Sequence, residues 1–201
     1  MRLRSDVARE SVRDCLRQIK AQYVSMIDVG SGPLSTLGTR FPGKHVHLIA
    51  VDPLADEYNA LLQRRGIDPP VRPIPCAGED LLDHFAPASF HIAFSENALD
   101  HAADPVRVIR NMFELVKPAG FVILDHGRNT GEYAAYGQLH QWNFDERNGR
   151  CILWRGTHEH DLVKEFGGAA ELHCRLQHAA PGSQERVICV LQRHPSPTAS
   201  P

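Results

Sequence analysis

Apolar and polar positions in the first 125 residues predict short strands separated by helices. Apolar residues recur at helical spacing over 105–116, where Asp104 can cap the helix and Pro105 suits its first turn. Three more helices are predicted over 6–22, 56–65 and 78–85. The β-prone runs between the helices occupy residues 23–29, 45–51, 71–75, 90–95 and 121–125. Strand and helix alternate with short connections, which favours a parallel sheet covered on both faces.

The alternation ends after residue 125. Residues 126–136 are polar and rich in glycine. Two β-prone runs, over 139–144 and 150–154, flank a hairpin turn at 145–149. The remaining predicted elements are a helix over 158–166 and strands over 171–177 and 186–192. This second part of the chain therefore predicts mostly β structure added to the α/β pattern.

The length of 201 residues is that of one domain with a small insertion. We expect a single domain over residues 1–193, with an inserted lid over 126–156 and a disordered Pro/Ser tail over 194–201. Hydrophobic residues make up 42% of the chain and charged residues 23%, which excludes a wholly disordered or fibrous protein.

The charge balance and the apolar runs limit the partners. There are 22 Lys and Arg residues against 24 Asp and Glu, so no basic surplus exists to hold a phosphate backbone, and no nucleic-acid partner is expected. The apolar runs fall far short of the roughly 20 residues that cross a membrane, and no apolar run follows the charged N-terminus. We therefore expect a cytoplasmic chain without a membrane partner, of undetermined oligomeric state.

No spacing in the sequence is typical of a metal site. The five cysteines are far apart, and no pair has the spacing of a zinc knuckle, which favours reduced thiols. His158 and His160 stand two apart on the expected helix and would point in different directions. No metal is therefore expected.

A glycine-rich turn follows the first predicted strand. It holds Gly30 and Gly32 at the edge where parallel sheets bind ligands, and glycine lets a ligand approach the backbone. Asp52 ends the second strand, where a carboxylate can accept hydrogen bonds from ribose hydroxyls. A structural turn and a strand-ending aspartate are the alternatives, but the two features in register favour a nucleoside site. The third glycine of a dinucleotide fingerprint is missing, because position 35 is Ser35.

These residues belong to a series of motifs that resembles the class I S-adenosylmethionine-dependent methyltransferases. The similarity is closest to small-molecule methyltransferases related to ubiquinone-biosynthesis C-methyltransferases. The motifs lie at residues 24–32, 48–52, 78–81, 90–101 and 115–124, and the run from Asn97 to His101 before Asp104-Pro105 is the most specific. The resemblance implies a doubly wound, Rossmann-like α/β sheet of seven mostly parallel strands. It also implies an antiparallel last strand and a β-hairpin insertion after the fifth strand.

The resemblance further implies the cofactor S-adenosylmethionine and the residues that hold it. Its sulfonium carries one positive charge and no phosphate, so acidic groups suit it better than a basic cradle. The implied cofactor-binding residues follow the first four strands: Asp28, Gly30, Ser31 and Gly32 at the methionine end, Asp52 at the ribose hydroxyls with Pro53 after it, Gly78, Glu79 and Asp80 beside the adenine, and Ser95 near the sulfonium. The chain departs from the family at Pro33 and Leu34, which replace the usual Thr or Ser and Gly.

Two histidines follow strands at the same edge and are the candidate bases for an acceptor proton. His101 follows the fourth strand and His126 the fifth, with a surface or structural histidine as the alternative for each. The segment 126–156 is polar but carries aromatic residues, so we expect it to cover the acceptor as a lid. A hairpin packed on the flank of the domain is the alternative. The candidate acceptor-binding residues are Asn97, Tyr136, His140 and Trp142.

The function that follows is methyl transfer from S-adenosylmethionine to a small-molecule acceptor, with oxygen ahead of nitrogen or carbon as the accepting atom. A protein or RNA acceptor would need more recognition surface and a basic stripe. The first alternative is a non-catalytic, cofactor-binding regulatory or scaffold protein of the same fold, which the departure at Pro33 and Leu34 motivates. The second is a nicotinamide-dependent oxidoreductase, which the missing third glycine disfavours.

Overall fold

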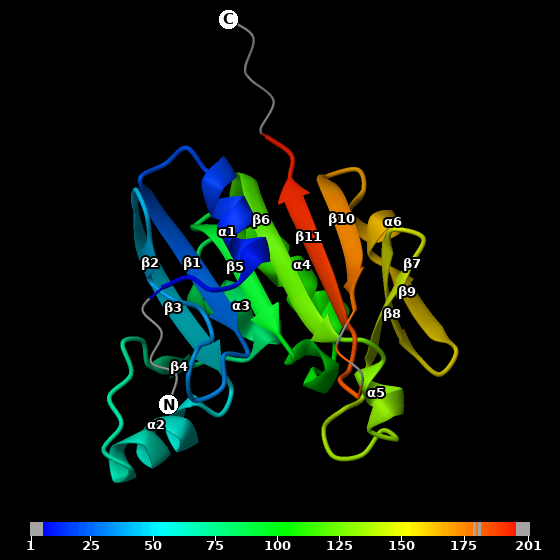
Figure 1. Ribbon diagram of the computed structural model, residues 1–201, viewed down its shortest axis with the longest axis horizontal. Coiled ribbons are helices and arrows are strands. Elements are labelled where there is room, and N and C mark those ends of the chain that lie inside the picture. Colours follow the sequence, from blue (N-terminus) through cyan, green and yellow to red (C-terminus); the bar gives the residue numbers. More distant parts are fainter. Residues whose placement is uncertain (1–5, 179, 181, 196–201) are drawn as a thin grey trace, which may run out of the picture.

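The fold is built on a mostly parallel sheet. The computed structural model describes residues 6–178, 180 and 182–195 of the chain. Its large sheet has eight strands in the order β10-β11-β6-β5-β1-β3-β2, with β4 paired to β3 (Figure 1). The strands are β1 (Tyr23–Val29), β2 (Arg40–Phe41), β3 (Lys44–Asp52), β4 (Pro73–Pro75), β5 (Phe90–Glu96), β6 (Val116–Gly127), β10 (Ala170–Gln177) and β11 (Arg186–Arg193). Strands β4, β3, β1, β5 and β6 run parallel, and β11 runs antiparallel to β6. The predicted α/β class is confirmed.

The number of strands differs from the expected seven. The additional strand is β2, which has two residues and turns back to pair antiparallel with the start of β3. Between β1 and β3 the described chain forms only this short strand and no helix. The glycine turn after β1 therefore leads into a loop, and no helix N-terminus faces the carboxyl edge of the sheet at this point.

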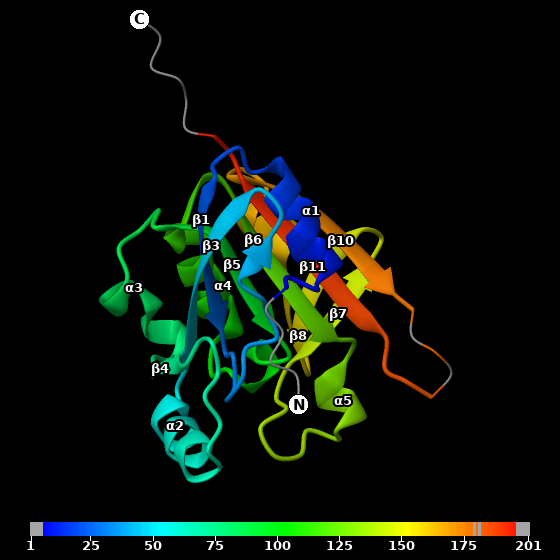
Figure 2. The ribbon, with the colours of Figure 1, turned by 60° about the vertical axis from the view of Figure 1, so that its left-hand side comes forward.

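Helices cover both faces of the sheet because the strands alternate their apolar side chains between them. On β1, Met26 belongs to the apolar cluster of one face and Ile27 to that of the other. Helix α1 (Glu10–Gln18) packs on the Met26 face, and α4 (Pro105–Leu115) packs on the Ile27 face (Figure 2). The sheet is therefore buried between two layers, as its continuous apolar strands predict.

Local contacts explain where each of these two helices begins. Helix α4 begins as predicted, because the Asp104 side chain accepts a hydrogen bond from the Arg107 N–H at 2.9 Å. Helix α1 is shorter than the helix predicted over 6–22. Its predicted start is instead extended, with Asp6 bridged to Arg40 and the Val7 N–H donating to the Arg40 carbonyl at 3.0 Å.

A second, three-stranded sheet stands beside the large one. It consists of β7 (Asn143–Arg147), β8 (Arg150–Arg155) and β9 (His158–Asp161), all antiparallel. The helix predicted over 158–166 is wrong in its first half, because residues 158–161 pair with β8 as a strand. Only α6 (Leu162–Phe166) is helical, with the Asp161 side chain accepting from the Val163 N–H at 3.0 Å.

The small sheet packs on the flank of the domain. Phe144, Cys151 and Leu153 belong to the same apolar cluster as α4. The strand predicted over 139–144 begins only at Asn143, and residues 139–142 form part of a loop. The strands of the insertion therefore lie where the alternative interpretation placed them, and the part of the insertion before β7 lies toward the carboxyl edge of the large sheet.

The carboxyl ends of β1, β3, β5 and β6 share one edge of the sheet, at the bottom of Figure 1. The short helical segments that follow the strands are α2 (Ala55–Arg64), η1 (Gly78–Asp80), α3 (Leu81–His84), η2 (Leu99–His101) and α5 (Thr130–Tyr133). Figure 1 shows α2 and α5 along this edge. Of the tail expected over 194–201, residues 196–201 lie outside the described residues.

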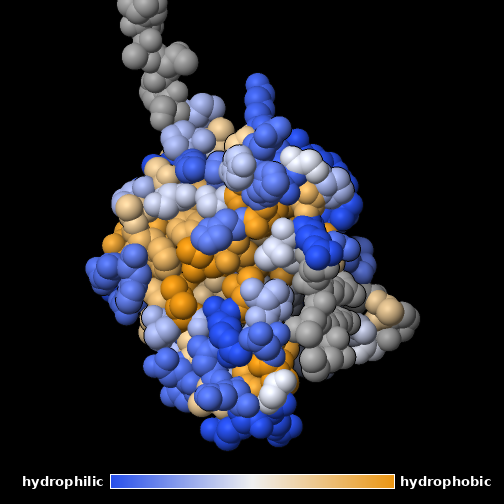
Figure 3. Space-filling model, turned by 90° about the vertical axis from the view of Figure 1, so that its left-hand side faces the viewer, coloured by the Kyte–Doolittle hydropathy of each residue, from blue (hydrophilic) through white to orange (hydrophobic). Residues whose placement is uncertain are grey.

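The side of the molecule formed by β2, β3 and β4 carries a broad apolar area framed by hydrophilic residues (Figure 3). Leu61 on α2 and Ile74 on β4 are among the exposed apolar side chains. Within the described residues, no helix combines the length and the apolar character needed to cross a bilayer.

Candidate functional site

A cavity of about 650 Å³ opens at the carboxyl edge of the sheet. Its wall is formed by the ends of β1 and β3, by η1 and by the residues around η2. Six residues of the predicted cofactor site line it: Gly30, Asp52, Pro53, Gly78, Glu79 and Asp80. The predicted base His101 lines it as well. A cavity of this size and position suits a nucleoside-containing ligand.

Asp52 connects the glycine turn to the end of β3. One of its carboxylate oxygens accepts a hydrogen bond from the Gly32 N–H and the other from the Leu54 N–H, both at 2.9 Å. The Gly30 and Ser31 N–H groups donate to the Val51 carbonyl at 2.9 and 3.1 Å. Each carboxylate oxygen can accept a second hydrogen bond. Asp52 can therefore hold the loop and still accept from ribose hydroxyls in the cavity.

Two of the lining glycines allow a close packing that a side chain would prevent. A Cβ at Gly30, where φ is +72°, would lie 2.3 Å from the Cβ of Ala98. A Cβ at Gly78 would lie 2.6 Å from a methyl carbon of Val108. Ala98 and Val108 also line the cavity. The two glycines therefore let their turns pack directly against Ala98 and Val108, and this close packing shapes the wall of the cavity.

The turn η1 is held in place by α4. The Asn111 side chain donates to the carbonyls of Gly78 and Glu79, at 3.2 and 2.8 Å. The Glu79 carboxylate accepts from the N–H groups of Ala103 and Asp104, at 3.1 and 3.2 Å. These bonds fix the expected adenine side of the cavity. Asn111 was not singled out from the sequence, because an asparagine inside a helix has no motif that reports such a contact.

Asp28 and Ser95 are placed differently from the residues that line the cavity. Asp28 is buried and its carboxyl accepts from the Ser35 hydroxyl at 2.5 Å. Burial raises the pKa of Asp28 to about 7, with smaller contributions from the charges of Glu96 and Asp52. Ser95 is fully buried and its hydroxyl donates to the Val29 carbonyl at 2.8 Å. The structure thus shows Asp28 ordering the loop and Ser95 joining β5 to β1.

An ion-pair network that the sequence did not indicate covers the ends of β5 and β6. Arg186 of β11 donates to Asp125 at 2.6 Å and lies 3.3 Å from Glu96. Arg9, which precedes α1, also pairs with Glu96, and the Thr36 hydroxyl donates to that carboxylate at 2.6 Å. The network joins segments far apart in the chain, so no local spacing reveals it.

The acceptor side of the cavity brings together two predicted residues and one that was not predicted. The His140 Nδ1 atom lies 2.6 Å from Asp100 Oδ2 and 3.0 Å from His101 Nε2. Asp100 is buried, while both imidazoles are about one-third exposed. Leu139, the neighbour of His140, lines the cavity. The loop before β7 thus reaches the cavity, although strands β7, β8 and β9 pack on the flank of the domain.

His126 is not placed as an acceptor base. Its ring is 1% exposed and stacks on Phe144 with the ring centres 4.1 Å apart. Neither ring nitrogen has a hydrogen-bond partner among the described residues, and burial lowers the pKa of His126 to about 3. This correction has a simple cause, since the side chain of His126 points into the apolar cluster behind β6.

The other predicted acceptor residues have structural contacts. Asn97 accepts from the Gly127 N–H at 2.9 Å, and the Tyr136 hydroxyl accepts from the Asn143 side chain at 3.0 Å. Trp142 is partly buried, with its ring centre 6.2 Å from that of His160. Among the four predicted acceptor residues, His140 is therefore the one whose side chain contacts a residue of the cavity wall, namely His101.

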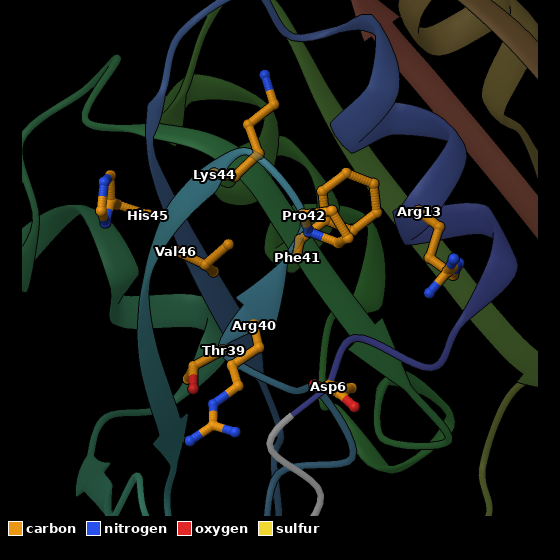
Figure 4. Close-up of a pocket in the computed structure, with 9 residues that line it drawn as sticks. All are labelled: Asp6, Arg13, Thr39, Arg40, Phe41, Pro42, Lys44, His45 and Val46. Carbon is orange, nitrogen blue, oxygen red and sulfur yellow. The ribbon is translucent and has the colours of Figure 1, made fainter.

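A second cavity, of about 640 Å³, lies between α1 and the edge of the sheet (Figure 4). Phe41 and Pro42 stand beside it, and the Arg13 guanidinium lies 5.6 Å from the centre of the Phe41 ring. None of the predicted site residues lines this cavity.

The family of methyltransferase domains matches residues 27–124. This segment contains the glycine turn, Asp52, η1 and η2. The curated proteins contain no significant sequence match to the chain.

Several solved methyltransferase structures have the same fold. The 1,6-didemethyltoxoflavin N1-methyltransferase of Burkholderia thailandensis, with 1,6-didemethyltoxoflavin and S-adenosylhomocysteine bound, is 13% identical over 92% of this chain and 77% of that chain, with a TM-score of 0.53. An S-adenosylmethionine-dependent methyltransferase of Methanosarcina mazei is 13% identical over 94% and 100% of the two chains, with a TM-score of 0.58. The CurJ carbon methyltransferase is 14% identical over 88% and 50%, with a TM-score of 0.58.

Proposed function

Since this chain is a class I S-adenosylmethionine-dependent methyltransferase, we propose that it methylates a small molecule whose acceptor atom enters the cavity beside His101. One observation carries this proposal. The 650 Å³ cavity combines the Gly30 turn, the Asp52 carboxylate and the η1 turn at the carboxyl edge of the sheet, within the segment that matches the family.

The chain's own residues would bind and orient the two reactants. Asp52 would accept from the ribose hydroxyls, Gly30 would lie against the methionine end, and Gly78 to Asp80 would lie beside the adenine. When bound, the cofactor supplies an electrophilic methyl group on sulfur. His101 and Leu139 would then bring the acceptor to the open side of the cavity, because alignment of the two reactants is the main task of the protein in an in-line transfer.

A small acceptor is supported by charge and by space. The net charge of −2 provides no basic surface for RNA, and the cavity is of the size that binds small ligands. Among the structural neighbours, one is an N1-methyltransferase and another is a carbon methyltransferase, so the fold serves several accepting atoms. We propose oxygen here, because the Asp100, His101 and His140 group lies where a hydroxyl would need activation.

Calorimetry with S-adenosylmethionine and S-adenosylhomocysteine, followed by mass analysis of products from a panel of small phenols, amines and carbon acids, tests the proposal. We expect both cofactor forms to bind and a product heavier by one methylene unit to form. Absence of cofactor binding would contradict it. Tight cofactor binding without turnover across the panel would favour the non-catalytic alternative.

A further inference from the structure

Asp100, His101 and His140 place three ligand atoms at one point on the acceptor side of the cavity. We propose that these three side chains bind a divalent transition-metal ion, and that this ion takes an acceptor through a hydroxyl oxygen. The metal site rests on the side-chain geometry alone. Its role toward the acceptor rests on the proposed function.

The distances fit a single small cation. Asp100 Oδ2, His140 Nδ1 and His101 Nε2 are separated by 2.6, 3.0 and 3.5 Å. A circle through these atoms has a radius of about 1.8 Å, and metal bonds to imidazole nitrogen and carboxylate oxygen are roughly 2.0–2.2 Å long. One ion placed just outside the plane of the three atoms therefore reaches all of them at normal bond lengths.

Hydrogen bonds alone cannot pair all three of these atoms well. If His140 Nδ1 carries the proton and donates it to Asp100, at 2.6 Å, the same proton cannot also be shared fully with His101 Nε2 at 3.0 Å. If His101 Nε2 carried the proton instead, its carboxylate acceptor would be 3.5 Å away, at the limit of a hydrogen bond. A cation accepts a lone pair from each of the three atoms at once.

The backbone holds the ligands in this arrangement. The Asp100 carbonyl accepts hydrogen bonds from the N–H groups of Gln141 and Trp142, at 2.8 and 3.2 Å. The residue that supplies the carboxylate thus also anchors the loop that supplies His140. Preorganised ligands raise metal affinity because less freedom is lost on binding.

The ligand set identifies the class of metal and leaves room for a substrate. Two imidazoles and one carboxylate with open positions suit Fe²⁺, Co²⁺, Ni²⁺ or Zn²⁺ better than Mg²⁺ or Ca²⁺. Asp100 is buried, but His101 and His140 are each about one-third exposed, so one side of the site faces outward. A site with three protein ligands and an open position is of the catalytic kind.

The ion would make a hydroxyl a competent nucleophile at neutral pH. A hydroxyl held at the open position loses its proton to solvent more readily, because the positive charge stabilises the oxygen anion. The oxygen lone pair then forms the C–O bond to the methyl carbon while the C–S bond breaks, and the bonding pair stays on sulfur. The acceptor class that follows is a phenol or an enol.

A second group of possible metal ligands must be separated in the test. Cys151, Cys174 and Cys189 come from three different strands and place their sulfur atoms within 4.8 Å of one another. This group belongs to the apolar cluster and is distinct from the cavity. Thiolates prefer softer ions and give cobalt a sulfur-to-metal charge-transfer band, which nitrogen and oxygen ligands do not.

The experiment titrates Co²⁺ into the full chain after removal of metal by a chelator. We expect one ion per chain, with visible bands of nitrogen and oxygen coordination. His140→Ala, His140→Gln and Asp100→Asn should each weaken binding by more than about 100-fold, since loss of even an outer-shell partner costs 10- to 100-fold. His173→Ala, an exposed histidine paired with Glu171, is the matched control and should bind as the parent does. Circular dichroism and thermal unfolding, measured on the same variants, report whether they are folded.

Three results would overturn the metal site: no cobalt binding, binding with a sulfur charge-transfer band only, or binding unchanged in folded His140→Gln. The acceptor role is tested separately with phenol acceptors. If the chelated enzyme methylates them as fast as the metal-loaded enzyme, the role of the ion is wrong and the proposed function stands. If cobalt binds to these residues but S-adenosylmethionine does not bind, the proposed function fails and the metal site stands.

Discussion

Asp52 holds the glycine loop in place and also lines the cavity with the same side chain. It accepts from the N–H groups of Gly32 and Leu54 and also lines the cavity, with 8% of its surface exposed. The residue at the end of β3 therefore sets the shape of the glycine loop before any ligand arrives. A substitution at Asp52 should therefore change both the shape of the glycine loop and the surface of the cavity.

Asp52→Ala should weaken binding of S-adenosylhomocysteine by about 1–3 kcal/mol, because the ribose hydroxyls lose a charged acceptor. Isothermal titration calorimetry measures the change. Asp68→Ala removes an exposed aspartate paired with Arg72 and should leave affinity unchanged. Equal affinity of Asp52→Ala and the parent would place the ribose elsewhere.

Substitutions at Gly30 and Gly32 should have different effects, although both glycines have positive φ. Gly30→Ala should abolish detectable cofactor binding, because its Cβ would lie 2.3 Å from that of Ala98. Gly32→Ala meets nothing within 4 Å and should cost only about 1–2 kcal/mol of folding stability from the left-handed backbone. Adding Ala98→Gly to Gly30→Ala should recover part of the affinity. Lack of any recovery would show that backbone strain alone explains the loss.

The buried His126 should make the folding stability of the protein depend on pH. Its pKa is lowered to about 3 by burial, against about 6.5 unfolded, so the unfolded chain binds the proton more strongly between these values. Its contribution is complete above about pH 6.5 and is lost as the pH falls toward 3.

His126→Leu should therefore lose less stability than the parent between pH 7 and 4.5, by on the order of 2 kcal/mol. Urea unfolding at the two pH values measures this difference. The raised pKa of Asp28 contributes with the opposite slope in both proteins and cancels in the comparison. Parallel pH profiles of the two proteins would contradict the assignment of His126 as a buried neutral ring.

At the scale of elements, short turns held by helices form much of the cavity wall. The 3-10 turn η1 has three residues and cannot hold its own shape, so α4 holds it through Asn111. Helix α4 is itself fixed by its cap at Asp104 and by its packing on the sheet. The position of η1, where we expect the adenine to bind, is thus set by a helix that follows it in the chain.

Asn111→Ala should loosen η1 and weaken cofactor binding several-fold, with a loss of about 1–2 kcal/mol in folding stability from two unmade hydrogen bonds. Asn59→Ala is the matched control, because the Asn59 side chain donates to the Pro73 carbonyl on β4 and does not touch η1. Thermal unfolding and calorimetry on both variants check this. We expect both to lose stability and only Asn111→Ala to lose this much affinity. A similar loss of affinity in both would deny η1 a specific role.

At the scale of the whole molecule, β11 completes the carboxyl edge that the earlier strands begin. Arg186 on β11 reaches the buried Asp125 at the end of β6 and the partly buried Glu96 at the end of β5. Burial raises the pKa of Asp125, while the Arg186 charge and its hydrogen bond act in the opposite direction. The charges of this edge are therefore balanced only once the full sheet has formed.

Arg186→Met should destabilise the fold by about 3 kcal/mol at pH 7, because the buried Asp125 would lose its nearest cation and Glu96 would keep only Arg9. The loss should shrink as the pH falls, since protonation of Asp125 removes the unpaired charge. Denaturant unfolding at several pH values measures it, with Arg186→Lys as the control that retains a charge. A pH-independent loss would indicate that packing of the side chain, and not its charge, is what matters.

The sequence by itself determined the α/β sheet and pointed to several residues that line one cavity. The continuous apolar strands, the Asp104 cap of α4, the pair Gly30 and Gly32 and the strand-ending Asp52 are local signals, because each is recognised from neighbouring residues in the chain. For this reason the α/β class was predicted, and Gly30, Asp52 and Gly78 were identified as residues that prove to line one cavity.

Only the tertiary structure decided the acceptor side. Residues 158–161 form a strand because β8 supplies their hydrogen bonds, and His126 is buried because Phe144 stacks on it. His140 reaches Asp100 across 40 positions, and three separated cysteines meet between two sheets. Contacts over such distances are set by the packing of whole elements, and no local pattern of polar and apolar residues specifies them.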